Sequence, residues 1–117
     1  MRKVIIKTVP YFERQAKKLL TNKVTEELFD HLEQHPEEGD LVSGTGGVRK
    51  LRWATGKNNK GKSGGVRVLY HYSENILVIL IMLYSKNDKE NITDAEKNEL
   101  KKLVPQLVRK YKEEEGF

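Results

Sequence analysis

The chain contains no cysteine at all, and this absence excludes several kinds of structure. Without thiols there is no disulfide framework and no metal site built on thiolate ligands. Long hydrophobic runs are missing as well. The longest run, Ile76–Tyr84, is far shorter than the roughly 20 apolar residues of a membrane-spanning helix, so we expect it to be a buried strand.

The N-terminal sequence MRKVIIKTVPYFERQ also lacks the apolar stretch of about 7–15 residues that defines a secretory signal. At 117 residues, the chain is long enough to enclose one hydrophobic core. We therefore expect a single domain over residues 1–117 and a cytoplasmic location.

Acidic residues are outnumbered, since 17 Asp and Glu stand against 22 Lys and Arg, for a formal net charge of +5. The excess is concentrated in Gly44–Tyr72, a segment without Asp or Glu. Clustered cations are the electrostatic footprint of a protein that binds a phosphate backbone, and RNA is the expected polyanion. The alternative is a solvated basic surface that only keeps the protein in solution. The basic residues of the segment are Arg49, Lys50, Arg52, Lys57, Lys60, Lys62 and Arg67.

The N-terminal third of the chain predicts one strand and two helices. The β-branched segment 2–8 is typical of an edge strand. Apolar residues at helical spacing predict a first helix over Tyr11–Leu20. A second helix, capped by Asn22 or Thr25, should end before Pro36 and form a hairpin with the first.

The rest of the chain predicts a loop, three strands and a helix. We expect Glu37–Gly47 to be a polar loop. The strands should be antiparallel, with a tight hairpin between the second and third, and the third should lie inside the sheet because it is apolar on both faces. They are Val48–Trp53, Val66–Tyr72 and Ile76–Tyr84.

The final helix should begin at Thr93-Asp94-Ala95-Glu96, which matches a capping box. Pro105 lies within its apolar pattern, so we expect a kink or break near Lys101–Val104. The predicted fold is therefore of the α+β class, an antiparallel sheet with an N-terminal helix hairpin and a C-terminal helix.

Alternation along the strands predicts which basic side chains share a face. Lys50 and Arg52 should lie together on one strand, and Arg67 and His71 on the next. With residues at the exit of the central strand, they would line a shallow groove where arginine binds phosphate and aromatic rings stack on bases. The exit residues are Tyr84, Lys86 and Asn87.

Such a groove could bind RNA or cleave it. Cleavage by the 2′-hydroxyl of RNA needs a base for the 2′-proton, cations for the phosphate and an acid for the leaving 5′-oxygen. Crowded cations disfavour the protonated form of a lysine, so a lysine could act as the base. The charge pattern alone leaves binding and catalysis open.

Other candidate sites are less specific. His31 and His35 have the spacing of metal ligands on a helix, but the sequence suggests no third ligand, so we interpret them as surface histidines and expect no metal. His71 could be a general acid or a stacking group, and the alternative is a packed, half-buried imidazole. The GKS within Lys57–Gly65 is not expected to form a P-loop, because the segment starts at Lys57 without the first glycine of that motif and no apolar strand leads directly into it.

Three runs of sequence are more specific than the charge pattern, namely GTGGVRKLRWA, GKSGGVRVLYHY and ILVILIMLYSKNDKENIT. In this order, they resemble the HigB-like branch of the RelE/ParE toxin superfamily. That branch typically reads G-T-G-G-hydrophobic-R-K-hydrophobic-R, then G-K-R-G-G-x-R-x-x-Y, then an apolar strand ending Y-x-K-N-E and a final helix. The resemblance covers about residues 35–110.

The resemblance implies a small RelE-like domain and a bacterial toxin of a type II toxin–antitoxin system. Such toxins are endoribonucleases that cut mRNA within the ribosome and so inhibit translation, without a cofactor. The implied partner is a cognate antitoxin encoded beside the toxin. In the HigB-like branch it carries a helix-turn-helix module, so operator DNA would be contacted only through the antitoxin.

The resemblance also implies roles for individual residues. Lys50 would be the base, Arg52 and Arg67 would stabilise the phosphate, and Tyr84 or Lys86 would support the leaving group. Further contacts with RNA are expected from Arg49, Lys57, Lys60, Lys62, His71 and Asn87.

Two other functions stay open on the sequence. A ParE-like toxin inhibits DNA gyrase without catalysis, but it needs no cationic cleavage site, so the clustered Lys50, Arg52 and Arg67 argue against it. The other is a non-catalytic module that binds RNA or the ribosome. The chain also departs from the prototype RelE pattern, which has an arginine where Asn87 falls and a tyrosine in the final segment, where this chain has only Tyr111.

Overall fold

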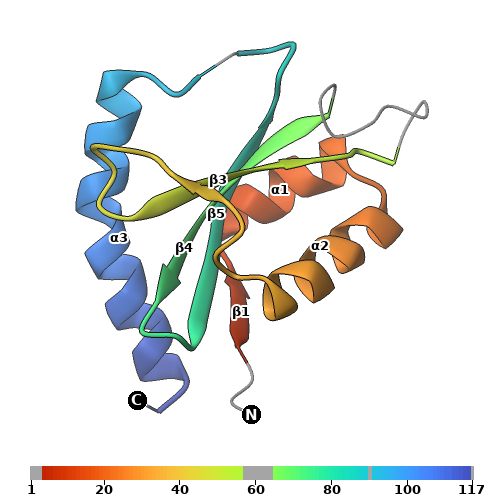
Figure 1. Cartoon of the computed structure of the whole chain (residues 1–117). Coiled ribbons are helices and arrows are strands. Elements are labelled where there is room, and N and C mark those ends of the chain that lie inside the picture. The colour runs from red at the N-terminus through yellow and green to blue at the C-terminus, as the bar shows by residue number, and fades with distance from the viewer. Residues whose placement is uncertain (1–3, 57–64, 90, 117) are drawn as a thin grey trace.

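The computed structural model of the protein describes residues 4–56, 65–89 and 91–116. A five-stranded sheet forms its centre, with two helices against one face and a third helix against the other (Figure 1). This is the α+β arrangement that the sequence predicts. In chain order the elements are β1 (Ile5–Thr8), α1 (Pro10–Leu19), α2 (Asn22–Gln34), β2 (Asp40–Leu41), β3 (Val48–Trp53), β4 (Val66–Ser73), β5 (Leu77–Ser85) and α3 (Asp94–Glu114).

The sheet has the strand order β1-β5-β4-β3-β2. Neighbouring strands are antiparallel except β1, which pairs in parallel with β5. β5 lies between β1 and β4 and is buried over most of its length, which confirms its predicted place inside the sheet. In the turn between β4 and β5, Glu74 and Asn75 have φ angles of 55° and 60°, the left-handed geometry of a type I′ hairpin.

The helices α1 and α2 form the predicted hairpin. Pro10 opens α1, because its fixed φ suits the first helical position. The N-cap of α2 is Thr21, whose extended backbone lets its hydroxyl accept a hydrogen bond from Val24 N at 3.2 Å. The prediction of Asn22 or Thr25 as the cap is wrong, since both residues already lie inside the helix.

β2 is an element that the sequence does not predict, since Glu37–Gly47 reads as a loop. Arg49 fixes the turn before β2 by donating hydrogen bonds from Nη1 to the carbonyl oxygens of Glu37 at 2.9 Å and Gly39 at 2.8 Å. The Tyr70 hydroxyl accepts a further bond from Gly39 N at 2.9 Å. A strand of two exposed residues has no hydrophobic pattern, so these tertiary contacts define it.

The helix α3 begins with the predicted capping box. Thr93 Oγ1 accepts a hydrogen bond from Glu96 N at 3.1 Å, and Glu96 Oε1 accepts one from Thr93 N at 2.8 Å. The predicted break near Lys101–Val104 is wrong, because α3 continues through Pro105. Proline removes one donor, but the apolar side of α3 packs on the sheet before and after it. No described helix, α3 included, is long and apolar enough to cross a membrane.

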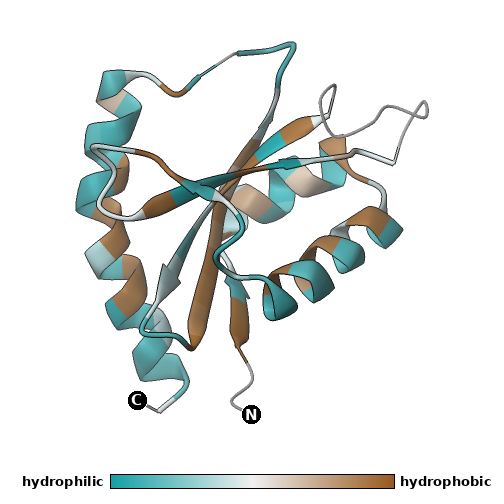
Figure 2. Ribbon diagram, in the orientation of Figure 1, coloured by the Kyte–Doolittle hydropathy of each residue, from teal (hydrophilic) through white to brown (hydrophobic). Residues whose placement is uncertain are grey.

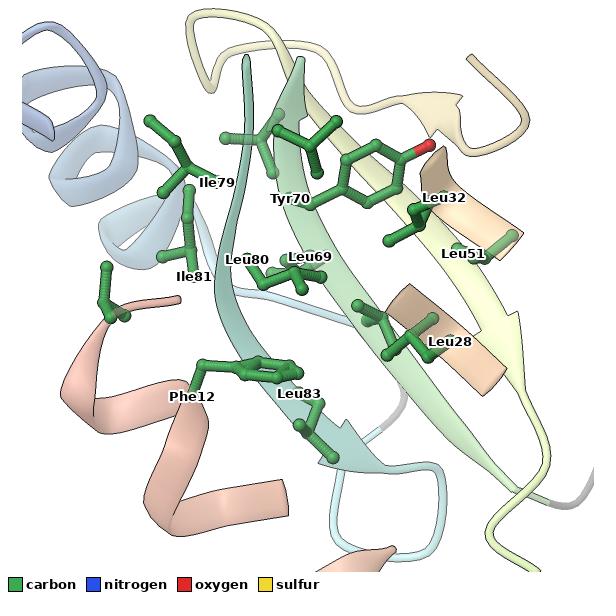
Figure 3. Close-up of a cluster of buried hydrophobic side chains, with 14 of the residues drawn as sticks. Phe12, Leu28, Leu32, Leu51, Leu69, Tyr70, Ile79, Leu80, Ile81 and Leu83 are labelled. Carbon is green, nitrogen blue, oxygen red and sulfur yellow. The ribbon is translucent and has the colours of Figure 1, made fainter. Parts of the chain in front are cut away.

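The main core fills the space between the sheet and the α1–α2 hairpin. Phe12 of α1 and Leu28 and Leu32 of α2 point toward the sheet, where they meet residues such as Tyr70 and Leu83 (Figure 3). Figure 2 shows apolar residues concentrated along the central strand β5 and polar residues over much of the helix surfaces. The opposite face of the sheet is covered by the buried side of α3, formed by Leu100, Val104, Leu107 and Tyr111.

Candidate functional site

Strand register brings three of the predicted catalytic residues into one row across the sheet. Arg52 of β3 is the direct cross-strand partner of Arg67 of β4, and Arg67 is the partner of Tyr84 of β5. Direct partners in an antiparallel pair point to the same face, with Cβ atoms roughly 4.5–5.5 Å apart. The three side chains therefore lie side by side, and we call them the Arg52–Arg67–Tyr84 row.

Two members of the row are buried although they are polar. Arg67 is 7% exposed and Tyr84 is 5% exposed. Arg67 Nη1 donates a hydrogen bond to Val66 O at 3.4 Å, and among the described residues no carboxylate forms an ion pair with Arg67 or Arg52. Like charges directly opposite each other are destabilising, and a buried cation needs a partner. The row is therefore suited to receive an anion.

The Tyr84 hydroxyl has no hydrogen-bond partner among the described residues, and its oxygen is buried. Burial raises the pKa of Tyr84, the positive charge of Arg67 opposes this rise, and the negative charge of Glu96 adds to it. The phenol is therefore protonated at neutral pH, and its hydroxyl is a buried donor that no described residue uses.

Lys50 lies on the same face as the row. Its register partners are Asp40 of β2 and Leu69 of β4. Lys50 and Arg52, together with Asp40 and Glu38, line an open depression of about 520 Å³. A carboxylate thus stands beside the predicted catalytic lysine, and sequence reasoning misses it because β2 is not predicted.

Two further charged residues lie at the Tyr84 end of the row. Lys89 Nζ is 5.5 Å from the centre of the Tyr84 ring and donates hydrogen bonds to both carboxylate oxygens of Glu96, at 2.6 and 2.5 Å. This hydrogen bonding is the main reason why the pKa of Glu96 lies below its ordinary value. In the sequence, Glu96 is visible only as a capping residue, because its contact with Lys89 follows no local pattern.

The predicted residues Lys86 and Asn87 lie in the exposed turn after β5. Lys86 N donates a hydrogen bond to Gly65 O at 3.4 Å, which joins this turn to the start of β4. Gly65 lies close against β3, since a Cβ atom there would be 2.2 Å from the carbonyl oxygen of Trp53. Only glycine permits this approach, next to the strand that carries Arg67.

Two residues predicted to bind RNA lie away from the row. Arg49 is on the opposite face of β3, where its guanidinium binds the carbonyl groups before β2. His71 shares a face with Arg67 but lies four residues further along β4, about 13 Å away at roughly 3.3 Å per residue. Its Nδ1 is 2.9 Å from Gly47 O, and it lines a separate cavity of about 570 Å³ beside α3. Both side chains are therefore engaged in contacts that support the fold.

The other residues predicted to bind RNA, Lys57, Lys60 and Lys62, lie outside the described residues. With Gly56, their segment does match the G-x-x-x-x-G-K-S spacing of a P-loop. That motif leads from a strand into a helix, whereas the next described element here is the strand β4. Gly56 has a packing role instead, because a Cβ atom there would be 2.4 Å from Val24 Cγ2 of α2.

His31 of α2 packs against Trp53, and His35 follows as the C-cap residue of the helix. His31 and His35 have ring centroids 5.0 Å apart, and the His31 ring lies 5.1 Å from a ring of Trp53. His31 Nε2 is 2.7 Å from Glu38 Oε2. Within residues 4–56, 65–89 and 91–116, no group of three His, Cys, Asp or Glu side chains is arranged to hold a metal ion.

The chain is similar to known proteins in both sequence and structure. A family model described as the RelE toxin of the RelE / RelB toxin-antitoxin system matches residues 3–115. Among solved structures, the chain matches E. coli toxin RelE, in a mutant with two arginine-to-alanine substitutions, in the free state. The two are 18% identical, and the match covers 77% of this chain and 90% of that chain with a TM-score of 0.52. The structural likeness shows a shared fold, and the family match includes every residue of the Arg52–Arg67–Tyr84 row.

Proposed function

Because the chain belongs to the family of RelE toxins of toxin–antitoxin systems, we propose that it is a ribosome-dependent endoribonuclease that cuts mRNA and thereby inhibits translation. The observation that carries this proposal is the Arg52–Arg67–Tyr84 row, which places two arginines and a protonated phenol on one face. Such groups suit the cleavage of a phosphodiester, since cations stabilise charge on the phosphate and a donor protonates the leaving oxygen.

The two arginines are the proposed phosphate-binding groups. A guanidinium can bind phosphate through two parallel hydrogen bonds. Arg67 is buried, and a fixed charge acts more strongly on a transition state where water is excluded. A bound phosphate would also relieve the repulsion between Arg52 and Arg67. This charge compensation would increase the affinity of the site for its substrate.

In the proposed reaction, the 2′-oxygen forms a bond to phosphorus while the bond between phosphorus and the 5′-oxygen breaks. The products are a 2′,3′-cyclic phosphate and a 5′-hydroxyl. We assign Tyr84 as the donor of the proton to the 5′-oxygen. Tyr84 is favoured over Lys86 because it lies opposite Arg67, whereas Lys86 lies in the exposed turn beyond β5.

Lys50 is the proposed acceptor of the 2′-proton. Asp40 is the second candidate, because it is the cross-strand partner of Lys50 and lines the same depression. Lys50→Met and Asp40→Asn separate the two roles. If Lys50 is the base, Lys50→Met abolishes cleavage across the pH range, whereas Asp40→Asn retains most of the activity. If Asp40→Asn abolishes cleavage and Lys50→Met retains most of it, Asp40 is the base.

The ribosome requirement can be tested with purified protein and mapped cut sites. The protein should cut message on translating ribosomes and barely cut the same RNA free in solution. The reason is that the groups of the row can position a phosphate, but the ribosome holds the message in one conformation. Equal cleavage of free RNA would contradict the ribosome-dependent part of the proposal.

A second experiment separates catalysis from binding alone. Arg67→Ala should stop cleavage while the variant still sediments with ribosomes. Arg109→Ala removes an exposed arginine of α3 outside the row and should leave cleavage unchanged. If wild-type protein binds ribosomes without cutting, the chain is a binding module and the nuclease proposal is wrong.

Membership of the family implies an antitoxin partner. From the HigB-like motifs, we propose that this antitoxin is a helix-turn-helix protein encoded next to the toxin. Expression of the chain alone should arrest growth, and co-expression with the product of the adjacent reading frame should restore it. Normal growth with confirmed folded protein would count against the toxin function itself.

A further inference from the structure

Lys89 is a cation at the edge of the row that the proposed mechanism does not use. It follows the exit turn of β5, and its ammonium group lies 5.5 Å from the centre of the Tyr84 ring. Its side chain is 29% exposed and that of its partner Glu96 is 35% exposed. The pair is therefore accessible to a ligand that approaches Tyr84 from solvent.

Glu96 is held in place independently of Lys89. Its Oε1 accepts the hydrogen bond from Thr93 N at 2.8 Å that completes the capping box of α3. If Lys89 moved away, the cap would keep the carboxylate where it is. The Lys89 side chain has no such second anchor, since its described contacts are Glu96 and the Tyr84 ring, while the Lys89 backbone N donates a hydrogen bond to Ser85 O at 3.2 Å. Lys89 is thus the mobile partner of the pair.

A carboxylate and a phosphate offer a lysine the same kind of contact, two anionic oxygens at hydrogen-bond distance. A partly exposed ion pair contributes little to stability, so exchange of one anion for the other costs little free energy. A phosphate bound by Arg67 would lie beside Tyr84, and therefore within reach of a lysine placed over that ring.

We propose that Lys89 is a further RNA-binding residue of this site. In the free protein, the Glu96 carboxylate occupies the position beside Lys89 that a phosphate takes when RNA binds. The proposal deepens the nuclease function and rests on it. On RNA binding, Lys89 leaves Glu96 for a phosphate oxygen, and Glu96 remains in the cap of α3. Glu96 thereby lowers the affinity of the free protein for RNA.

The probe is a short RNA with 2′-O-methyl groups, which cannot be cut because its nucleophile is blocked, with binding measured by fluorescence anisotropy. Glu96→Gln keeps the capping box, in which glutamine also serves, but releases Lys89. It should bind the probe about two- to fivefold more tightly than wild type. Lys89→Met should bind more weakly, and the slope of log affinity against log salt should fall by about 0.7, as expected for one lost contact with single-stranded RNA.

Glu74→Gln is the matched control. Glu74 pairs with Lys112 at 2.8 Å on the β4–β5 hairpin, away from the row, so this variant makes the same change of charge and also frees a lysine. It should leave binding unchanged. The double variant with Glu96→Gln and Lys89→Met should bind like Lys89→Met alone, because Glu96 acts only through Lys89.

Equal affinities of Glu96→Gln and Glu74→Gln, or of Lys89→Met and wild type, would overturn the proposal. The cleavage assay on ribosomes distinguishes this failure from failure of the function. If wild type cuts message while the binding series is flat, the role of Lys89 is wrong and the nuclease stands. If the binding series holds but wild type does not cut, the site binds RNA phosphates and the nuclease function is wrong.

Discussion

The two ends of one sheet face differ in how their charges are compensated. At the end near the β4–β5 hairpin, Lys7 of β1 pairs with Glu115 at 2.6 Å, and Lys112 of α3 pairs with Glu74 at 2.8 Å. The Tyr111 hydroxyl there donates a hydrogen bond to the carbonyl oxygen of Thr8 at 3.2 Å. Each of these polar groups has a partner, and together they attach α3 to the sheet.

At the other end, the Arg52–Arg67–Tyr84 row places two arginines side by side and buries a tyrosine hydroxyl, with no carboxylate partner among the described residues. The two ends lie on the same sheet face beside the same helix α3, although Lys7 belongs to β1 and Arg52 to β3. A folded chain that leaves buried polar groups without partners loses stability. This contrast is what we expect if the row receives a ligand, as we propose, while the contacts at the hairpin end stabilise the fold.

The sharpest test of this contrast is Arg67→Met, which replaces a buried cation with a flexible, unbranched apolar side chain. Cleavage should fall by about 10²–10³-fold, as for loss of one charge-stabilising group. The melting temperature should stay the same or rise, because the repulsion with Arg52 is removed. Cut-site mapping and thermal unfolding measure the two effects, and a clear drop in melting temperature would show that Arg67 is structural.

The same chemical change can be made at both ends of the face. Tyr84→Phe removes a buried hydroxyl without a partner, so the free energy of unfolding should rise by about 1 kcal/mol. Cleavage should fall by at least about 10²-fold if Tyr84 is the general acid. Denaturant unfolding and the ribosome assay provide the readouts. Full activity of this variant would show that another residue is the general acid.

Tyr111→Phe should show the opposite pattern. It removes the hydroxyl that donates to Thr8 O, so the free energy of unfolding should decrease by about 1 kcal/mol. Cleavage should be unaffected, since Tyr111 lies far along α3 from the row. If Tyr111→Phe and Tyr84→Phe changed stability in the same direction, the two ends of the face would not differ as described.

The smallest expected effect concerns pH. Because the folded-state pKa of Glu96 is depressed, chiefly by Lys89, the pair adds stability above the ordinary carboxyl pKa of 4.5. This stability is lost as pH falls through the lower folded-state pKa. The effect should stay below about 1 kcal/mol, since the pair is partly exposed. Unfolding curves should show a shallower loss below pH 4.5 for Glu96→Gln than for wild type, and identical curves would contradict the assignment.

Much of the fold can be predicted from the sequence because its signals are local. Apolar spacing indicates the helices, and alternation correctly separates Lys50 and Arg52 from the opposite face of β3. The same alternation places Arg49 on that opposite face. The charge pattern alone does not distinguish Arg49 from its basic neighbours. β2 escapes prediction because its two residues are exposed and are held only by long-range hydrogen bonds.

The candidate site is less accessible from sequence, because it depends on register and tertiary contacts. The alignment of Arg52 with Arg67 and Tyr84 depends on the lengths of the connections and on the irregularity between Leu69 and Tyr70, where β5 shifts by one residue. Alternation reveals that side chains share a face, but it does not reveal which of them are direct partners. The pairing of Lys89 with Glu96 cannot be predicted from the sequence either, because it is a tertiary contact without a local pattern.

The parallel pairing of β1 with β5 bears on how the protein is made. Ile5 meets Leu77, so the first described strand can find its neighbour only after most of the sheet has been synthesised. A growing polypeptide lengthens by about 5–20 residues per second, so β1 remains unpaired for several seconds during synthesis. The partner strand of β1, β5, also carries Tyr84. A partly made chain therefore lacks Tyr84 and with it the complete Arg52–Arg67–Tyr84 row, at which we propose that RNA is cut.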